Sequence, residues 1–359
     1  MVMEKLLIIN PGSTSTKIAV YEGDKQVFGE SISHSTEEIS KYGSVGDQYD
    51  FRKDLVLKTL ADKGYDIRTF ACVVGRGGIL PPIQAGAYEV NEDMVWQLRY
   101  APVFEHASNL GGMIAYEIAK PLGIPAYIYD AVAVDEMPQM NKITGWKDIE
   151  RLGHGHNLNM RATAIRYAKE NGKSYKDISV VVAHLGGGCS VSLHYKGRIA
   201  DIVNDEDGSF TPERAGALPM GPFVRKIFKE GWDEKTTLKQ LKSQGGLTSH
   251  LGTNDSRVVE KMIAEGDEYA DMVYKAMAMN ISRNIAREFP IVSGDVEAIL
   301  LTGGIAYSEK FTGMIKERLS FLAPVHIYAG ENEMQSLAEG GLRVLRGEET
   351  AHTFTKVIV

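Results

Sequence analysis

Short apolar runs alternate with polar, glycine-containing turns near the start of this chain. Residues 6–9 form an apolar run that predicts a strand, and a turn built on Asn10, Pro11 and Gly12 follows it. Residues 16–21 predict a second strand, and a tight turn at residues 22–24 leads into a third. The pattern therefore predicts three consecutive strands joined by two turns.

The same order of elements returns in the second half of the chain. Residues 179–203 predict an apolar strand, a polar turn from His184 to Gly188, a second strand, a turn at Lys196 and Gly197, and a third strand. Two similar units so far apart predict a duplicated domain with one phosphate-binding turn in each half. Two such turns facing each other would hold a polyphosphate between them.

The residues of the first turn suit an oxyanion. Glycine allows close approach of the backbone, and the N–H groups and hydroxyls of Ser13, Thr14 and Ser15 can donate hydrogen bonds to phosphate oxygens. The turn therefore indicates a phosphate site.

Further strands and helices alternate along the rest of the chain, which predicts an α/β fold. Apolar runs predict strands at residues 70–74, 126–129, 298–301 and 325–328. Helical spacing predicts helices at residues 49–64, 105–119 (with His106 in the first turn), 156–171 (opened by His156) and 335–346, and a mostly helical region at 223–289.

Two charged residues follow predicted strands at the edge where α/β sheets usually bind ligands. Arg76 follows residues 70–74, and its guanidinium can clamp a carboxylate or phosphate, although an arginine that only fixes a loop remains the alternative. Asp130 follows residues 126–129 and can act as a helix cap or as an acid near Mg²⁺. We therefore expect ligand chemistry at this edge.

The composition is that of an ordinary globular protein. The chain has 359 residues, 43% of them hydrophobic, and a net charge of −7, which argues against binding nucleic acid or a membrane surface through overall charge. No apolar run approaches the roughly 18 residues of a membrane span, and none resembles a signal peptide. The two cysteines, Cys72 and Cys189, have no paired spacing. These features predict a cytoplasmic protein.

A zinc site built from His106, His154, His156 and His184 is a rival interpretation. The His-Gly-His sequence lacks the i, i+4 spacing of helical zinc ligands, and no carboxylate stands close by in sequence to complete a recognisable set. We therefore do not predict zinc.

Eight short motifs stand in one order from Ile9 to Glu349: INPGSTSTK, GRGG, EHASNLG, VVAHLGGG, FTPER, LGTND, LTGGIA and LRVLRGEE. In this order they resemble the acetokinase family of short-chain carboxylate kinases, most of all its butyrate kinases, within the superfamily of acetate and sugar kinases, chaperone ATPases and actin. The resemblance implies two duplicated actin-like domains of ribonuclease H-like α/β fold with an active-site cleft between them. It places the first domain at residues 1–153, completed by a C-terminal helix at 334–359, and the second, which binds nucleotide and forms the homo-oligomer, at 154–333.

The resemblance also implies a reaction and a set of site residues. The expected reaction is the reversible phosphorylation of butanoate by ATP, with Mg²⁺, to give butanoyl phosphate and ADP. The expected catalytic residues are Asn10, Arg76, Asp130, His156 and Arg214. The expected nucleotide-binding residues are Ser13, Ser15, Lys17, His184, Gly186, Gly187, Gly188, Asp255, Ser256, Arg257, Gly303, Gly304 and Ile305. Asn10, Asp130 and Glu333 are expected to hold Mg²⁺, largely through water.

Two points have alternatives: which residue is the second active-site arginine, and which carboxylic acid is the substrate. Arg214 is preferred to Arg225, which helical periodicity places on a helix. Gly78 and Gly155 stand where acetate kinases are expected to carry bulky residues, so together with Pro212 they predict a widened acyl pocket for butyrate or a branched acid such as isobutyrate, with acetate and propionate as alternatives. A non-catalytic ATP switch and a sugar kinase using Asp130 as general base are the rival classes.

Overall fold

The computed structural model describes residues 3–103, 105–204 and 207–357, which form two units. The first unit runs to Asp135 and is completed by the chain from Asn332 onward, and the second is Glu136–Glu331. The two boundaries therefore differ from the expected ones, by 18 residues at the first crossing (153 against 135) and by two at the second (333 against 331).

The segment at residues 136–153 belongs to the second unit because it bonds to that unit's outermost strand, β9 (Arg198–Val203). The Ile199 amide donates to Glu136 Oε2 (2.8 Å), and Asn141 Nδ2 donates to the Ala200 carbonyl (3.1 Å). Arg151 forms an ion pair with Asp201 at 3.0 Å. These polar contacts are made at long sequence separation, so the pattern of apolar residues did not indicate them.

The first unit is built on a seven-stranded sheet with the order β12-β5-β6-β4-β1-β2-β3. The strands are β1 (Lys5–Pro11), β2 (Ser15–Glu22), β3 (Lys25–Ser33), β4 (Cys72–Arg76), β5 (Ala87–Glu89), β6 (Ala126–Tyr129) and β12 (His352–Thr353). Its helices are α1 (Thr36–Ile39), α2 (Tyr49–Asp62), α3 (Glu92–Tyr100), α4 (Asn109–Ala119) and α13 (Glu333–Leu345).

The second unit has a five-stranded sheet with the order β11-β10-β7-β8-β9. Besides β9, its strands are β7 (Ser179–Leu185), β8 (Cys189–Tyr195), β10 (Ala298–Gly303) and β11 (Val325–Ala329). Its helices are α5 (Gln139–Lys142), α6 (Asn157–Glu170), α7 (Met220–Glu230), α8 (Glu234–Ser243), α9 (Gly246–Leu251), α10 (Ser256–Ala264), α11 (Glu268–Arg287) and α12 (Glu309–Leu319).

Five strands of the first sheet repeat the second sheet strand for strand. β3-β2-β1-β4-β6 corresponds to β9-β8-β7-β10-β11, with an antiparallel meander of three strands followed by two parallel ones. Each meander has a register shift just before the last two residues of its middle strand, at Val20/Tyr21 and at Leu193/His194. The duplication predicted from the sequence is therefore present in the topology.

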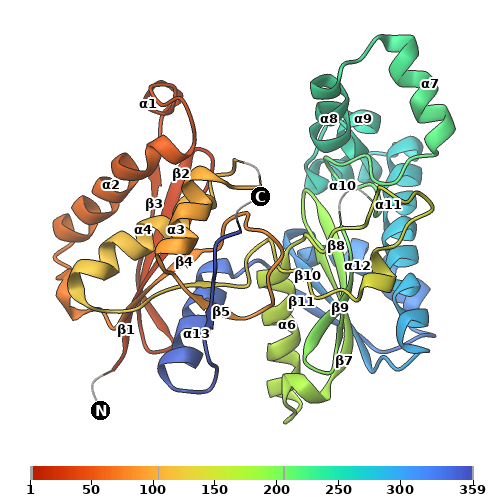
Figure 1. Ribbon diagram of the computed structural model, residues 1–359. Helices are drawn as coiled ribbons and strands as arrows, with labels where there is room; N and C mark the ends of the chain where they lie inside the picture. Colours follow the sequence, from red (N-terminus) through yellow and green to blue (C-terminus); the bar gives the residue numbers. More distant parts are fainter. Residues whose placement is uncertain (1–2, 104, 205–206, 358–359) are drawn as a thin grey trace. The chain divides into compact units, whose positions relative to one another are not determined.

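In the first unit α4 and α13 pack on opposite faces of the central strands (Figure 1). Helix α13 lies beside strand β1, although more than 300 residues separate the two elements in the chain. Gly75 permits the approach of α4, because a Cβ there would lie 2.2 Å from the Gly111 carbonyl oxygen. Gly340 does the same for α13 against the ring of Tyr129, at 2.4 Å. Small residues thus set the depth at which both helices pack.

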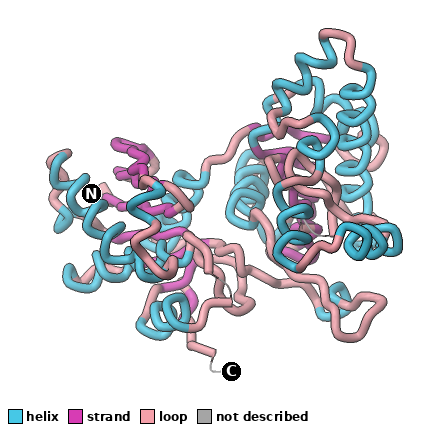
Figure 2. Tube along the Cα trace, turned by 90° about the horizontal axis from the view of Figure 1, so that it is seen from above, coloured by secondary structure: helices cyan, strands magenta, loops and turns pink. Residues whose placement is uncertain are grey.

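In the second unit helices cover both faces of the sheet (Figure 2). One face, with Val181, Ala183 and Leu301, packs against α11 and α12, and the other, with Val180, Val182 and Leu300, packs against α6. Strand alternation sends successive residues of β7 into these two cores. None of the helices in the described residues is long and apolar enough to cross a bilayer.

One predicted helix begins later than expected. α4 starts at Asn109, so His106 lies in the preceding turn rather than in the helix. Its Nδ1 is 2.8 Å from the Ser108 hydroxyl and accepts from the Ser108 amide (3.3 Å), and these local bonds hold the turn outside the helix.

Candidate active site

Strand alternation brings two predicted site residues to the α13 side of the first sheet. Leu6 and Val74 contact α13 at Gly341, so Asn10 and Arg76, which are an even number of residues further along β1 and β4, lie on the same side. Both stand at the carboxyl ends of neighbouring parallel strands. This is the edge at which the sequence analysis expected a ligand.

The first residue of α13, Glu333, lies between these two side chains. Asn10 Nδ2 donates to Glu333 Oε2 at 2.7 Å, and Arg76 Nη2 lies 3.6 Å from Glu333 Oε1. Asn10 and Glu333, which are 323 positions apart in the chain, therefore meet at one edge of the sheet.

The guanidinium of Arg76 retains hydrogen-bonding capacity. Its side chain is only 10% exposed, and Nη1 is buried without a hydrogen-bond partner among the described residues. His106 lies nearby, and burial together with the positive charge of Arg76 holds the pKa of His106 below its usual range. The imidazole is therefore neutral at pH 7, and Arg76 is the group here that can bind an anion.

Asp130 is buried directly after β6 and has a left-handed backbone (φ 40°), which is rare for a residue with a side chain. Its Oδ1 accepts from the Gly86 amide at 2.7 Å, and its own amide donates to the Gly86 carbonyl at 3.1 Å. At least one oxygen of this carboxylate is thus engaged in fixing the loop before β5.

The predicted phosphate residues of the first turn lie at the same end of the sheet. Ser13 is exposed and Ser15 half-buried, and Lys17 stands opposite Asn10 in the β1–β2 ladder with its side chain exposed. The Gly12 amide donates to the Ser15 carbonyl at 2.7 Å, which closes the turn. The turn is therefore compact and open to solvent on its serine side.

Arg52 on α2, which was not predicted as a site residue, holds this turn from behind. Its guanidinium is buried and donates to the carbonyl oxygens of Gly12, Ser13 and Ser15. A lone arginine within a helical pattern gave no signal of this role.

An analogous arrangement occurs in the second unit, where α6 takes the position that α13 has in the first. His184, near the end of β7, lies on the α6 side, and its Nδ1 accepts from Asn159 Nδ2 at 2.9 Å. Asn159 Nδ2 also donates to the Thr302 hydroxyl on β10 (3.2 Å). With Nδ1 as acceptor, Nε2 is the ring nitrogen that can donate, and it lies 3.1 Å from Glu331 Oε1.

His156 stands at the N-cap of α6 and stacks on His184 with ring centroids 3.9 Å apart and planes 4° from parallel. Its Nδ1 lies 2.9 Å from the Ser190 hydroxyl. The bond from His184 lowers the pKa of Glu331, whose carboxylate is therefore ionised at neutral pH. Glu331 and Asn159 were not predicted as site residues.

The glycine turns of the second unit lie at the carboxyl ends of β7 and β10. The Gly186 amide donates to the Gly188 carbonyl (3.1 Å), and the Gly187 carbonyl accepts from the Glu213 amide (3.2 Å). Gly303 has φ 91°, and a Cβ there would lie 2.4 Å from the carbonyl oxygen of Leu185.

The two residues after Gly303 border a more open region. A Cβ on Gly304 would meet nothing within 4 Å, and Ile305 is half-buried. Gly303 is therefore required by packing, whereas Gly304 leaves space for a ligand.

The predicted nucleotide residues 255–257 form the start of α10. Asp255 is its N-cap and accepts from the Arg257 amide at 2.9 Å, and the two side chains form an ion pair at 2.6 Å. Hydrogen bonds from Arg257 lower the pKa of Asp255 to about 2. Ser256 is the first residue of the helix.

The two candidate second arginines have different surroundings. Arg214 is half-buried in the turn that bonds to Gly187, with Nη1 3.7 Å from Glu213 Oε2. Glu213 is in turn held by Asn254 Nδ2 at 2.7 Å. Arg225 lies on α7 and is exposed. The structure therefore associates Arg214, and not Arg225, with a glycine turn.

Gly78 and Gly155, which the sequence places at a widened acyl pocket, are closely packed within their units, and the pocket stays a prediction. A Cβ on Gly78 would lie 2.7 Å from Asn109 and from the Leu98 side chain, and one on Gly155 would lie 2.5 Å from Ile202 Cδ1. A β-carbon at either position would therefore displace a neighbouring group. Pro212 is buried, and its carbonyl accepts two bonds from Thr248, both at 3.0 Å.

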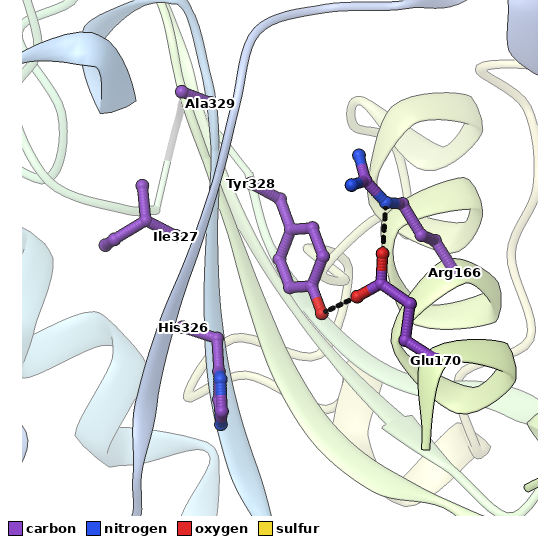
Figure 3. Close-up of a pocket in the computed structure, with 6 residues that line it drawn as sticks. All are labelled: Arg166, Glu170, His326, Ile327, Tyr328 and Ala329. Carbon is purple, nitrogen blue, oxygen red and sulfur yellow. Dashed lines mark hydrogen bonds and ion pairs between the residues drawn. The ribbon is translucent and has the colours of Figure 1, made fainter. Parts of the chain in front are cut away.

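The described residues contain no group of three or more His, Cys, Asp or Glu side chains arranged to hold a metal ion. A cavity of about 400 Å³ lies elsewhere, between β11 and α6, where Glu170 bonds to Tyr328 and Arg166 (Figure 3). None of the predicted site residues lines it.

The duplicated architecture defines the class, which is an α/β protein of two duplicated domains with the actin-like fold. The crystal structure of Porphyromonas gingivalis acetate kinase superposes with a TM-score of 0.80, covering 95% of this chain and 100% of that one at 17% identity. At this identity the likeness shows the fold, and it confirms the fold predicted from the sequence.

The sequence comparisons give the family. The model described as "Acetokinase family" matches residues 144–336. Butyrate kinase 1 of Clostridium acetobutylicum is 45% identical over 354 residues, which is 98% of this chain and 100% of that protein. Butyrate kinase 2 of the same organism is 46% identical over 352 residues, 98% of this chain and 99% of that protein. The chain belongs to the acetokinase family.

Proposed function

We propose that this protein is a carboxylate kinase that phosphorylates butyrate, converting butanoate and ATP reversibly to butanoyl phosphate and ADP. The observation that carries this proposal is Arg76, a buried guanidinium beside Asn10 and Glu333 at the ligand-binding edge of the sheet, one nitrogen of which has no partner among the described residues. The near-full-length similarity to two proteins named butyrate kinase supports the same reaction.

The chemistry requires charge neutralisation rather than a general base. A carboxylate oxygen is already an anionic nucleophile, so catalysis depends on alignment and on stabilising the transferring phosphoryl group. We assign Arg76 and Arg214 to the carboxylate and phosphoryl oxygens. His156, at the N-terminus of α6, is assigned to a phosphoryl oxygen, because its side chain adds a donor to the positive end of a helix.

The nucleotide is assigned to the turns at the strand ends. Asn10, Ser13, Ser15 and Lys17 bind phosphate groups in the first unit. In the second unit His184, Gly186, Gly187 and Gly188 do the same, while Asp255, Ser256, Arg257, Gly303, Gly304 and Ile305 hold the ribose and base. The open space at Gly304 supports the last assignment.

The residues present fit a Mg²⁺ ion held largely through water. Mg²⁺ in kinases typically binds one or two carboxylates together with substrate phosphates, so no cage of protein ligands is needed. Asn10, Asp130 and Glu333 supply such oxygens at one edge, and Glu333 is already bonded to Asn10. When bound, the ion neutralises charge on the phosphate oxygens.

The test is an acyl-phosphate trap with purified protein, ATP, Mg²⁺, hydroxylamine and unbranched and branched acids from acetate to valerate. We expect hydroxamate formation to be greatest with butyrate. A maximum at isobutyrate, propionate or acetate would keep the reaction and change the substrate. Absence of hydroxamate with every acid, together with measurable ATP binding, would support a non-catalytic ATP switch instead.

A sugar kinase is disfavoured by the surroundings of Asp130. A general base needs an oxygen free to accept the proton of a hydroxyl acceptor. Oδ1 of Asp130 already accepts from the Gly86 amide at 2.7 Å, and the proposed Mg²⁺ site uses an oxygen of the same carboxylate. Assay with a panel of hexoses tests this alternative directly.

We further propose that the protein acts in the cytoplasm. We also propose that it forms a homo-oligomer through the second unit. α7 exposes Met220 (73%), Val224 and Phe228 (82%) at i, i+4 and i+8, so one apolar stripe of this helix is uncovered within the chain. Light scattering of the wild type and of Phe228→Ser tests the proposal. A monomeric wild type would contradict it.

A further inference from the structure

A buried arginine lies behind the turn at residues 12–16. Arg52, on α2, is 1% exposed. Its Nη1 donates to the carbonyl oxygens of Gly12 (2.7 Å) and Ser15 (3.2 Å), and its Nη2 donates to that of Ser13 (3.1 Å). One side chain thus binds three carbonyl groups of a five-residue turn.

The guanidinium is fixed in position from its other side. Gln48, at the N-cap of α2 and also buried, accepts from Arg52 Nη2 at 2.7 Å and from Nε at 3.1 Å. The planar guanidinium can donate to the turn carbonyls and to Gln48 at the same time, which a lysine ammonium cannot do.

The positive charge of Arg52 has no carboxylate partner. Within residues 3–103, 105–204 and 207–357, the guanidinium forms no ion pair with Asp or Glu, and its bonds are to neutral oxygens. A buried charge without a counter-ion is costly. An anion bound on the far side of the turn would supply the missing negative charge.

Peptide geometry relates the bonds of Arg52 to that far side. In a planar trans peptide the carbonyl and the following N–H point in opposite directions, and the described chain has no cis bond. Because the carbonyls of Gly12 and Ser13 point toward Arg52, the amides of Ser13 and Thr14 point away from it. Both residues are exposed, and neither amide donates a hydrogen bond within the described structure.

We propose that Arg52 is a positioning residue that turns the amides of Ser13 and Thr14 outward to bind the phosphate groups of the nucleotide. Successive N–H groups with a positive charge behind them form an anion site. The inference deepens the proposed function and rests on it only in naming the anion as a nucleotide polyphosphate. Arg52 does not touch the phosphates, since the turn lies between them.

The first experiment compares Arg52→Lys and Arg52→Met with wild type. Calorimetry measures the dissociation constants of ATP, tripolyphosphate and adenosine, and thermal melting reports folding. The matched control is Arg68→Met, because Arg68 is an exposed arginine of the same unit whose partner is Asp66.

We expect both Arg52 variants to bind ATP and tripolyphosphate about tenfold or more weakly, the loss of roughly one hydrogen bond to a charged group. Adenosine affinity should be unchanged, and Arg68→Met should match wild type. Unchanged tripolyphosphate affinity in a folded Arg52 variant would overturn the proposal. So would an equal loss for adenosine and tripolyphosphate, because a merely structural role predicts that result.

A second measurement needs no variant to fold. Wild-type protein carrying ¹⁵N-labelled serine and threonine is titrated with tripolyphosphate, and the Ser13 and Thr14 amide signals are expected to move downfield as they form hydrogen bonds. If neither signal moves at saturation, the proposal is wrong. Both measurements omit the acid substrate, so a failure to phosphorylate butyrate would overturn the proposed function without affecting them.

Discussion

Replacing Arg76 by alanine is expected to reduce turnover with butyrate by about 10²–10³-fold. The side chain is 10% exposed, Nη2 lies 3.6 Å from Glu333, and Nη1 has no partner among the described residues. A donor directed at charge that develops in the transition state typically contributes about 3–4 kcal/mol, and about 1.4 kcal/mol corresponds to a factor of ten in rate. The expected loss follows from these two values.

The assay is hydroxamate formation at saturating ATP and varied butyrate, which separates kcat from KM. If Arg76 binds mainly the ground-state carboxylate, KM rises and kcat is retained, whereas transition-state stabilisation lowers kcat. Arg76→Lys is expected to fall between wild type and Arg76→Ala, because it keeps the charge and loses the bidentate geometry. Thermal melting of each variant, with exposed Arg68→Ala as control, excludes loss of fold as the cause.

One result would refute this reasoning. If Arg76→Ala melts like wild type and turns over butyrate within about tenfold of it, the unpartnered nitrogen does not contribute to catalysis at the level expected of such a donor. The edge formed by β1, β4 and α13 would then require another role.

Three further predictions concern the second unit. Arg214→Ala should lower kcat by about 10²-fold or more, whereas the exposed Arg225→Ala should stay within about threefold of wild type, and the reverse order would reassign the second arginine. Gly303→Ala should lose more than about 2 kcal/mol of stability, because φ is 91° and a Cβ would collide with a backbone carbonyl, whereas Gly304→Ala should stay within about 0.5 kcal/mol in chemical denaturation. Burial raises the pKa of Glu288 well above its usual 4.5, so the folded state binds this proton more tightly and the associated stability is lost as pH rises from 4.5 through the folded pKa. Glu288→Gln should therefore be more stable than wild type between pH 5 and 8, and the difference in the free energy of unfolding should grow as the pH rises. A difference that stays constant across that range would contradict the raised pKa.

The fold was largely predictable because its signals are local. Apolar runs of four to six residues gave the central strands, with β6 matching residues 126–129 and β1 extending the predicted run by one residue before and two after it. Glycines after strands marked the turns, and the repeat of this pattern gave the duplication. The same pattern of apolar runs predicted that Arg76 and Asp130 lie at strand ends.

The boundaries between units were not predictable to the residue. Glu136 and Arg151 bond to β9 and its neighbourhood through polar groups, which leave no periodicity in the sequence. The width of the acyl pocket is not predictable from its glycines for a related reason. Whether a missing side chain leaves space depends on its neighbours, and Leu98 and Ile202 lie next to Gly78 and Gly155 here.

By itself, the amino-acid sequence determined the α/β class, the duplication, the family and the residue types at the strand ends, because each of these depends on contiguous stretches of chain. The resemblance already placed Asn10 and Glu333 at one Mg²⁺ site, but only the tertiary structure brought Glu333 to Arg76, Asn159 to His184, and Arg52 to the phosphate turn. These contacts join side chains from separate elements, and their geometry is set by how α13, α6 and α2 pack on the sheets. The energy of that packing comes from apolar surfaces that are spread over each unit, so no single motif records where the polar groups will meet.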